Sequence, residues 1–386
     1  MTDVVIAGIG QTPVGEHWDV SLRDLAERAM LAAIADAGGL RPDALYVGNF
    51  LSPVVSHQAN LGALLVDHAG LNGIEAFTVE AAGASGAGAL HMGYLAVASG
   101  YVDAALVIGV EKYTDQTGSE LETAIAQSMD NDYEAVHGLT PTGQAALLMQ
   151  RYLHDCDVPR QALGAFALIA HANGTGNPNA MYRKAIRPET YARAGLVSDP
   201  LNLFDVAPYA DGAAAALLTR PELLPEAARA RLVRVSGSSV AIDRLALHDR
   251  PDPLAFEAAG VSLQRACRQA GILPGDVDFF ELCDAYSIYA ALSLEAAGFA
   301  RRGEGWRLAE RGELNLDGRL PISTLGGLKA RGNPLGAAGL YQAVEAVQQL
   351  RGEAGANQLA HPRRALVQSL GGPAATAVTH VLERLN

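Results

Sequence analysis

Cysteine, long apolar runs and positive charge are all scarce in this sequence. Its 386 residues include three cysteines, Cys156, Cys267 and Cys283, which are too few and too scattered for a disulfide framework or a zinc cluster. This usage predicts no bound metal and a reducing compartment, the cytoplasm. No apolar run reaches the roughly 18 residues of a membrane span. The first residues, MTDVVIAGIG, predict a strand rather than a secretory signal.

The shortage of positive charge restricts the partners that the protein can bind. Against 42 acidic residues there are 29 lysines and arginines, which gives a net charge of −13. Nucleic acid and anionic membrane surfaces would be repelled at long range, so we expect neither as a partner. An anionic ligand would need a local basic pocket. Since 49% of the residues are hydrophobic, the chain can bury a large core, in one large domain or two fused halves.

An internal repeat favours two fused halves. An apolar helical stripe that ends near Ala37 is followed by GGLRPDALYVGNF, and a similar stripe that ends near Ala270 is followed by GILPGDVDFFELC. The two align without a gap as far as Phe50 and Cys283. The segment GASGAGALHMGYLAVASG with the strand DAALVIGVE likewise resembles GNPLGAAGLYQAVEAVQQL with RRALVQSLGG. Each half therefore predicts a helix, a strand, a glycine-rich turn, a helix and a strand.

The apolar strands predict the fold class and its boundaries. DAALVIGV and ALVQSL are apolar at nearly every position, which is typical of strands covered by helices on both faces, so we expect a duplicated α/β fold. Residues 1–112 and 201–235 are expected to form the first half, and residues 236–386 the second. Residues 113–200 are a polar insertion, expected to be a loop that caps a site. The turn GIGQTPVG lacks the full GxGxxG spacing, which argues against a dinucleotide-binding fold.

Five blocks of this sequence resemble those of the thiolase superfamily, in order and over almost the whole chain. The resemblance is closest to the sterol-carrier-protein type thiolases and their lipid-transfer-protein-like relatives. It implies two halves in a five-layered α-β-α-β-α arrangement. It also implies chemistry on a carbon–carbon bond beside a coenzyme A thioester, which is the substrate, with no covalently bound cofactor. The blocks are VEAAGASGAGALHMGYLAVASGYVDAALVIGVEKYTD, DPLNLFDVAPYADGAAAALLT, ELCDAYS, GGLKARGNPLGAAG and QSLGGPAATAV.

The resemblance implies that several catalytic positions of the family hold other residues here. In thiolases a cysteine at the amino end of a buried helix is activated by the helix dipole and a histidine, and it carries the acyl group. That position is Gly83 in this sequence. The histidine of the GHP motif falls on Asn333, and the histidine of the HDCF or HDAF motif falls on Cys283. We therefore do not expect acyl transfer through a cysteine at position 83.

The neighbouring residues complete the candidate catalytic set. A tyrosine hydroxyl beside Asp284 could act as a general acid or base. The backbone N–H groups of Gly83 and Gly371 could form an oxyanion hole. Simpler structural roles remain open, since Gly83 could be a close-packing glycine and Asn333 a helix cap. The candidate catalytic residues are Gly83, Cys283, Asp284, Tyr286, Asn333, Ser369 and Gly371.

A basic segment of the insertion is the candidate coenzyme A site. MYRKAIRPE is the densest basic patch there, and it lies where related thiolases place their coenzyme A-binding loop. Such a patch would reverse the field of an acidic protein around the phosphates of the ligand. The alternative is a solvated charged loop. The candidate coenzyme A-binding residues are Arg183, Lys184, His171 and Gly327.

Three functions remain open at this stage. The first is an enzyme that acts on acyl-CoA thioesters without a covalent intermediate, by aldol or retro-aldol chemistry or decarboxylation. The second is a catalytically silent subunit that binds acyl-CoA or scaffolds a partner. The third is a thiolase, an acetyl-CoA acyltransferase, that uses another cysteine, such as Cys283. The resemblance also implies a homodimer, joined near AFTVEA, and a small partner protein with a zinc ribbon and an OB-fold.

Overall fold

The computed structural model describes residues 3–226 and 231–385, so residues 1–2, 227–230 and 386 of the expected halves lie outside the described part. Nine strands form one mixed sheet in the order β3-β2-β4-β7-β1-β8-β11-β10-β9, and two short strands, β5 and β6, pair separately. The strands are β1 (Val5–Gln11), β2 (Ala44–Gly48), β3 (Glu75–Val79), β4 (Ala104–Glu111), β5 (Leu196–Ser198), β6 (Leu201–Asn202), β7 (Gly212–Thr219), β8 (Val233–Ile242), β9 (Phe279–Glu281), β10 (Arg364–Gly371) and β11 (Thr376–Arg384).

Local sequence signals account for the ends of several helices. Ser21 and Asp24 form a reciprocal capping box at the start of α1. The side chain of Thr140 caps the start of α6. Gly271 and Gly352 end α9 and α12 in the left-handed conformation. The α-helices of the described residues are α1 (Leu22–Asp36), α2 (Ser52–Val55), α3 (Leu61–His68), α4 (Ser85–Ala98), α5 (Ser119–Ala126), α6 (Pro141–Asp155), α7 (Gly164–Gly174), α8 (Pro188–Ala192), α9 (Glu257–Ala270), α10 (Ser287–Ala296), α11 (Gly305–Glu310) and α12 (Ala338–Arg351).

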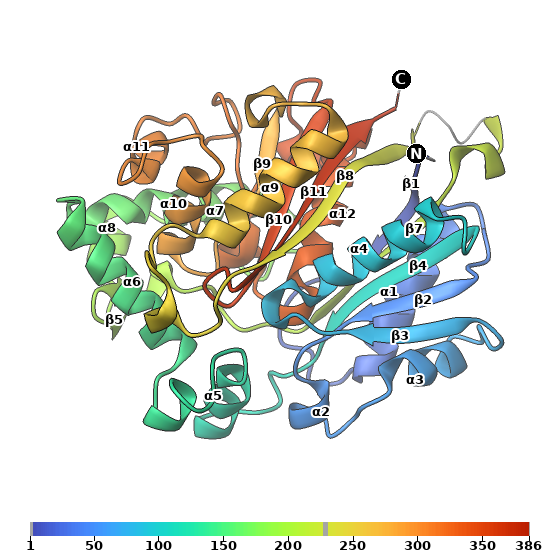
Figure 1. Ribbon diagram of the computed structural model, residues 1–386, viewed down its shortest axis with the longest axis horizontal. Helices are drawn as coiled ribbons and strands as arrows, with labels where there is room; N and C mark the ends of the chain where they lie inside the picture. The colour runs from blue at the N-terminus through green and yellow to red at the C-terminus, as the bar shows by residue number, and fades with distance from the viewer. Residues whose placement is uncertain (1–2, 227–230, 386) are drawn as a thin grey trace.

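Helices form three layers around the two halves of the sheet. α1 and α3 cover the outer face of the first half, and α9, with α10 packed on it, covers the outer face of the second half. α4 and α12 pack against each other between the halves and contact strands of both. Figure 1 shows residues 1–112 of the first half in blue and cyan, and the second half in yellow to red. This arrangement confirms the expected five-layered thiolase-like α/β fold.

The internal repeat corresponds to equivalent elements of the two halves. α1 and β2 of the first half match α9 and β9 of the second, and α4 and β4 match α12 and β10. The halves are joined where β1 pairs with β8, through Val5 with Arg234 and Ile6 with Val233. Every residue of β4 and β7 is buried, as expected for strands with helices on both faces.

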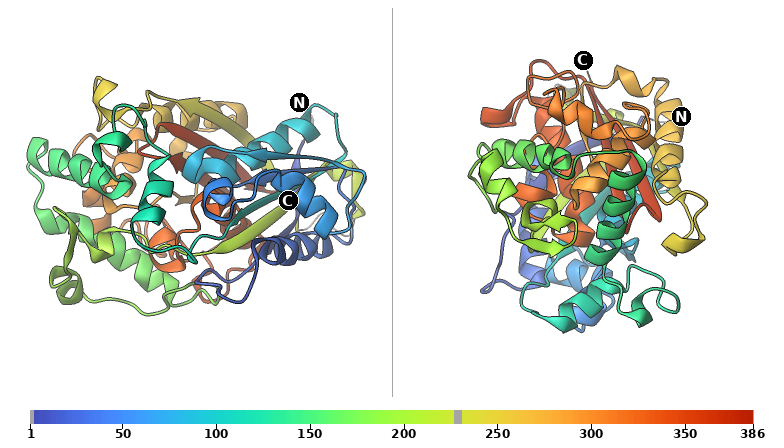
Figure 2. Two further views of the ribbon diagram at one scale, coloured as in Figure 1. Left: turned by 90° about the horizontal axis from the view of Figure 1, so that it is seen from below. Right: turned by 90° about the vertical axis from the view of Figure 1, so that its left-hand side faces the viewer.

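The insertion at residues 113–200, which was expected to be a loop, combines α-helices with loops. It contains α5, α6, α7 and α8, and α6 and α7 pack against α10. Leu148 and Phe166 belong to the hydrophobic core of the second half. Both views of Figure 2 show this green segment beside the orange helices of that half. No helix in the described ranges is both long and apolar enough to cross a membrane.

Candidate active site

A small cavity of about 70 Å³, here called the inner cavity, brings together residues that are far apart in the sequence. Its walls come from the segment that leads into α4, the turn after β9, the segment before α12 and the end of β10. Phe50 and Cys283, which the internal repeat matched, both line it. Five of the candidate catalytic residues line the inner cavity: Gly83, Cys283, Tyr286, Asn333 and Ser369.

Gly83 lies in the short 3₁₀ turn η1 (Ala82–Ala84), directly before α4. The backbone of β10 lies close to its Cα, because a Cβ atom added at this position would be 2.8 Å from the carbonyl oxygen of Leu370. That distance is shorter than real Cβ contacts, so any side chain here would force the backbone to move. The Ser369 hydroxyl donates a hydrogen bond to the carbonyl oxygen of Gly83 at 3.3 Å. Gly83 therefore contributes backbone to the cavity wall.

Cys283 is a buried thiol that follows β9. Burial raises its pKa to about 11, against the opposing effect of hydrogen bonds from the backbone N–H groups of Ala285 and Leu370. Because the thiolate is the nucleophilic form, only about one molecule in ten thousand would carry it at pH 7. The cysteine that lines the inner cavity is therefore held as a neutral thiol.

Asn333 lines the inner cavity and directly precedes Pro334, the N-cap residue of the next helical turn. Its Oδ1 accepts a hydrogen bond from the N–H of Leu335 at 3.2 Å, at the start of η10 (Leu335–Ala337). Its carbonyl oxygen accepts a hydrogen bond from the Tyr113 hydroxyl at 2.6 Å. The side chain of Asn333 is therefore not the N-cap of η10, and a ligand contact through its Nδ2 donor stays a prediction.

Tyr286 and Asp284 have different neighbours. The Tyr286 hydroxyl lies 3.1 Å from Thr142 Oγ1 on α6. Asp284 Oδ1 accepts a hydrogen bond from the N–H of Leu328 at 2.7 Å, and Oδ2 has no hydrogen-bond partner among the described residues. Burial raises the pKa of Asp284 and raises the pKa of Tyr286 to about 12. No direct hydrogen bond joins Tyr286 to Asp284 within residues 3–226 and 231–385, so the tyrosine–aspartate pair considered above is not formed.

Gly371 and Gly327 are packed behind the cavity walls. An added Cβ at Gly371 would lie 2.6 Å from the carbonyl oxygen of Ala81, and one at Gly327 would meet the Asp284 carboxylate. Neither glycine lines a cavity near the candidate residues. Both positions are therefore ones where two parts of the chain approach too closely for a side chain.

A larger cavity of about 440 Å³, here called the outer cavity, adjoins the inner cavity. Val206, Ala207 and Tyr209 line both cavities and form the wall between them. The exposed residues Val197 and Leu203 also line the outer cavity, whose walls are mostly apolar with a few polar groups. This composition is typical of a small-molecule site.

Two lysines, Lys184 and Lys329, and the carboxylate of Glu122 line the outer cavity. Lys184 and His171 line it, whereas Arg183 is exposed and lines neither cavity. His171 stacks on Tyr182, with ring centroids 6.1 Å apart, and burial together with the charge of Lys329 lowers its pKa. Lys329 is buried and donates hydrogen bonds to the carbonyl oxygens of Asp205 at 2.6 Å and Phe204 at 3.2 Å. Burial lowers the pKa of Lys329 to about 8.

Four further residues at the two cavities were not among the sequence candidates. Tyr209 and Lys329 lie inside two of the blocks quoted above, so the same resemblance could have drawn attention to them. Thr142 and Glu122 lie in the insertion, where no motif singles them out, and only the packing of α5 and α6 brings them to the outer cavity.

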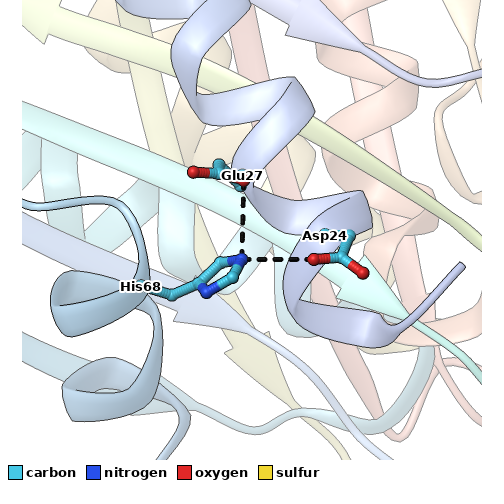
Figure 3. Close-up of side chains that lie close together, drawn as sticks. All are labelled: Asp24, Glu27 and His68. Carbon is cyan, nitrogen blue, oxygen red and sulfur yellow. Dashed lines mark ion pairs between the residues drawn. The ribbon is translucent and has the colours of Figure 1, made fainter.

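A separate group of three titratable side chains lies away from both cavities. His68 Nε2 on α3 is 3.2 Å from Asp24 Oδ1 and 3.4 Å from Glu27 Oε2 on α1, as Figure 3 shows. All three residues are partly exposed, and Asp24 also accepts hydrogen bonds from Ser21 at the helix cap. The group is accounted for as an ion pair that ties α3 to α1.

Comparisons with known proteins agree with the fold. The thiolase N-terminal domain family matches residues 4–222, and the thiolase C-terminal domain-like family matches residues 239–384. The chain is 40% identical over 386 residues to an acetyl-CoA acetyltransferase of Methanothermobacter thermautotrophicus, covering 100% of both chains. It is 31% identical over 375 residues to the benzoylsuccinyl-CoA thiolase subunit BbsB of Thauera aromatica, covering 96% of this chain and 94% of that one. A solved structure of an Ltp2-ChsH2(DUF35) aldolase superposes with a TM-score of 0.85 at 25% identity, covering 99% of this chain and 98% of that chain.

Proposed function

The chain belongs to the thiolase superfamily, and from that premise we propose that it makes or breaks a carbon–carbon bond beside a coenzyme A thioester without an acyl–cysteine intermediate. The observation that carries the proposal is the backbone packing at Gly83. The position that the family resemblance assigns to the nucleophile has no side chain, and a Cβ added there would lie only 2.8 Å from the carbonyl oxygen of Leu370.

Cys283 does not supply an obvious replacement for the nucleophile. Its thiol lines the inner cavity, but burial raises its pKa to about 11. The histidine that would activate it in a thiolase is not among the residues that line this cavity. A thiolase reaction through Cys283 is therefore the less favoured alternative.

Aldol chemistry needs groups that this cavity does have. An enolate of the thioester requires hydrogen-bond donors at its oxygen and an acid or base near the carbon–carbon bond, but no nucleophile. The Nδ2 group of Asn333 and the hydroxyl of Tyr286 are donors in the wall of the inner cavity. One of the similar solved structures is described as an aldolase, which supports the same class of reaction.

The outer cavity is the proposed position of the coenzyme A portion. Lys184 and Lys329 contribute positive charge to an otherwise acidic protein, and the apolar wall with Tyr182 and Phe204 suits a pantetheine chain. The acyl group would then reach the inner cavity past Val206 and Tyr209, which line both spaces.

A second candidate function is a subunit that works only with a partner. The aldolase structure named above has ChsH2(DUF35) as a second component. By analogy we propose that a small protein with a zinc ribbon and an OB-fold delivers the thioester to this chain. The same analogy allows a catalytically silent acyl-CoA-binding role for the chain itself.

Product analysis of two probe thioesters tests the proposal. With a 3-hydroxyacyl-CoA, alone and with the partner protein added, we expect a shortened acyl-CoA and a free aldehyde or ketone by liquid chromatography. With acetoacetyl-CoA and free coenzyme A, we expect no thiolysis above background. Thiolysis that disappears in Cys283→Ala would establish the thiolase alternative, and binding of the thioesters without turnover would establish the silent subunit.

A further inference from the structure

A chain of hydroxyl groups crosses the wall between the inner and outer cavities. The Tyr286 hydroxyl faces the inner cavity and lies 3.1 Å from Thr142 Oγ1. Thr142 and Tyr209 both line the outer cavity, and the side chain of Thr142 opposes the rise in the pKa of Tyr209. In order from the inner cavity, this series of side chains consists of Tyr286, Thr142, Tyr209 and the carboxylate of Glu122.

The series of hydroxyl groups ends at a carboxylate that water can reach. The Tyr209 hydroxyl donates a hydrogen bond to Glu122 Oε1 at 2.9 Å. Glu122 is partly exposed on α5, and it lines both the outer cavity and a second pocket formed by α5 and the segment after it. Tyr286, at the other end, is buried. The four side chains therefore extend from a buried hydroxyl in the inner cavity to a partly exposed carboxylate.

We infer that these four side chains form a proton relay, the hydroxyl relay, which supplies the acid–base function of the inner cavity. This inference rests on the proposed function, and it assigns the acid–base role that the sequence left open. Each hydroxyl can donate one proton and accept another, so the chain can pass a proton in either direction without a net change in its middle members.

The relay accounts for every proton in a retro-aldol cleavage. The substrate β-hydroxyl gives its proton to Tyr286, and Tyr286 passes its own proton to Thr142. Thr142 then passes its proton to Tyr209, and Tyr209 passes its proton to the Glu122 carboxylate. The carbon–carbon bond breaks as the hydroxyl carbon becomes a carbonyl, and the electron pair forms the thioester enolate. The relay then runs in reverse, so that the proton on Glu122 returns through the hydroxyls to the enolate carbon. No oxidant or reductant is needed.

The electrostatics of the site are compatible with this role. Burial raises the pKa of Tyr286 to about 12, and burial together with the neighbouring Tyr286 and Glu122 raises the pKa of Tyr209 further. Both phenols are therefore neutral at pH 7 and hold the protons that a relay must exchange. A neutral relay also avoids placing a bare charge in a cavity with mostly apolar walls.

Deuterium exchange into the methyl group of acetyl-CoA tests the relay without requiring the true substrate. In D₂O, proton NMR follows loss of the methyl signal as the enolate forms and is deuterated. Thr142→Val removes one hydroxyl at nearly constant size and should slow the exchange at least about tenfold. Thr142→Ser keeps the hydroxyl and should restore most of the rate. Glu122→Gln, on the partly exposed α5, should slow the exchange even if Thr142→Val fails to fold.

Calorimetric titration with acetyl-CoA distinguishes a failure of the relay from a failure of the proposed function. In Thr142→Val the affinity should fall much less than the exchange rate, because the relay moves protons and Thr142 is only one of the residues that line the outer cavity. Thr123→Val, one residue from Glu122 on the exposed face of α5, is the matched control and should exchange at the wild-type rate. Three results would overturn the relay alone. They are an exchange rate in Thr142→Val equal to that of wild type, an exchange rate in Thr142→Ser as slow as that of Thr142→Val, and binding of acetyl-CoA by wild type without exchange. Absence of binding by wild type would overturn the proposed function as well.

Discussion

At residue scale, the account depends on how closely the backbone of β10 approaches Gly83. The sequence alone left a close-packing glycine and a lost nucleophile as alternatives at this position. The structure supports close packing, since an added Cβ would be 2.8 Å from the Leu370 carbonyl oxygen. This contact joins residues 287 positions apart in the sequence, and no local pattern around Gly83 could have predicted it.

Restoring a cysteine at this position should therefore fail to restore a thiolase. We expect Gly83→Cys and Gly83→Ala to lower the free energy of unfolding by a similar amount, roughly 1–3 kcal/mol, because both add the same Cβ to a packed site. We also expect no thiolysis of acetoacetyl-CoA by Gly83→Cys, because Asn333 cannot act as a base. Denaturant unfolding and a thiolysis assay check the two parts. Robust turnover by Gly83→Cys would show that the thiol alone was missing.

A buried histidine gives the fold a pH dependence that can be isolated. His380 donates from Nε2 to the carbonyl oxygen of Ala87 at 3.1 Å, so its Nδ1 is the acceptor for the Ser238 hydroxyl at 3.0 Å. Burial and the nearby His91 lower the pKa of His380 to about 3. Since this value lies below the ordinary value of 6.5, the unfolded state binds the proton first as the pH falls.

The stabilising effect of neutral His380 should be complete above pH 6.5 and lost as the pH falls toward 3. In His380→Gln, which keeps a donor for Ala87, this contribution is absent. Below pH 6.5 the unfolding free energy of the wild type should therefore fall relative to that of the variant, by up to roughly 1.4 kcal/mol per pH unit. Urea unfolding at pH 7.5, 6.0 and 5.0 measures it. A constant difference over this range would contradict the assignment.

At element scale, the sequence predicted the regular parts of the fold well. The apolar strands and the internal repeat can be read from the sequence itself, and α1 with β2 and α9 with β9 occur where the repeat places them. The helices of the insertion were missed, because its Asn, Gly and His content masks the apolar stripes of α6 and α7. Those stripes pack on α10, an element more than a hundred residues further along the chain.

The basic segment before α8 provides the test of the outer cavity. Lys184 lines this cavity, so Lys184→Ala should weaken acyl-CoA binding by roughly 1–3 kcal/mol, the scale of a lost charge-assisted hydrogen bond. Raised salt should weaken binding by wild type more than by the variant. Arg193→Ala is the control, because Arg193 is exposed at the end of α8 and lines neither cavity. Equal affinities for Lys184→Ala and wild type in calorimetry would remove Lys184 from the site.

At the scale of the whole molecule, the nine-stranded sheet has an open edge at β3. Phe77, in the middle of that strand, is 62% exposed, and an open apolar edge favours pairing with another chain. The sequence resemblance implied a homodimer through this segment. We therefore expect a particle of about twice 40.3 kDa, joined by two β3 strands related by a twofold axis.

Phe77→Lys should shift this assembly toward the monomer, because a charge at the centre of the edge opposes its pairing with a copy of itself. Leu273→Lys, at an exposed position away from β3, is the matched control and should leave the mass unchanged. Light scattering at micromolar concentration measures both variants. A wild type of 40.3 kDa, or a variant that remains dimeric, would refute pairing through β3.

The central claim is that the protein acts on the thioester without carrying the acyl group on a cysteine. Mass spectrometry of the intact protein, quenched during incubation with a 3-hydroxyacyl-CoA or acetoacetyl-CoA, tests this most directly. The account predicts an unmodified chain at every time point, including times at which a shortened acyl-CoA accumulates. An acyl adduct mapped to Cys283 that forms and decays during turnover would contradict it.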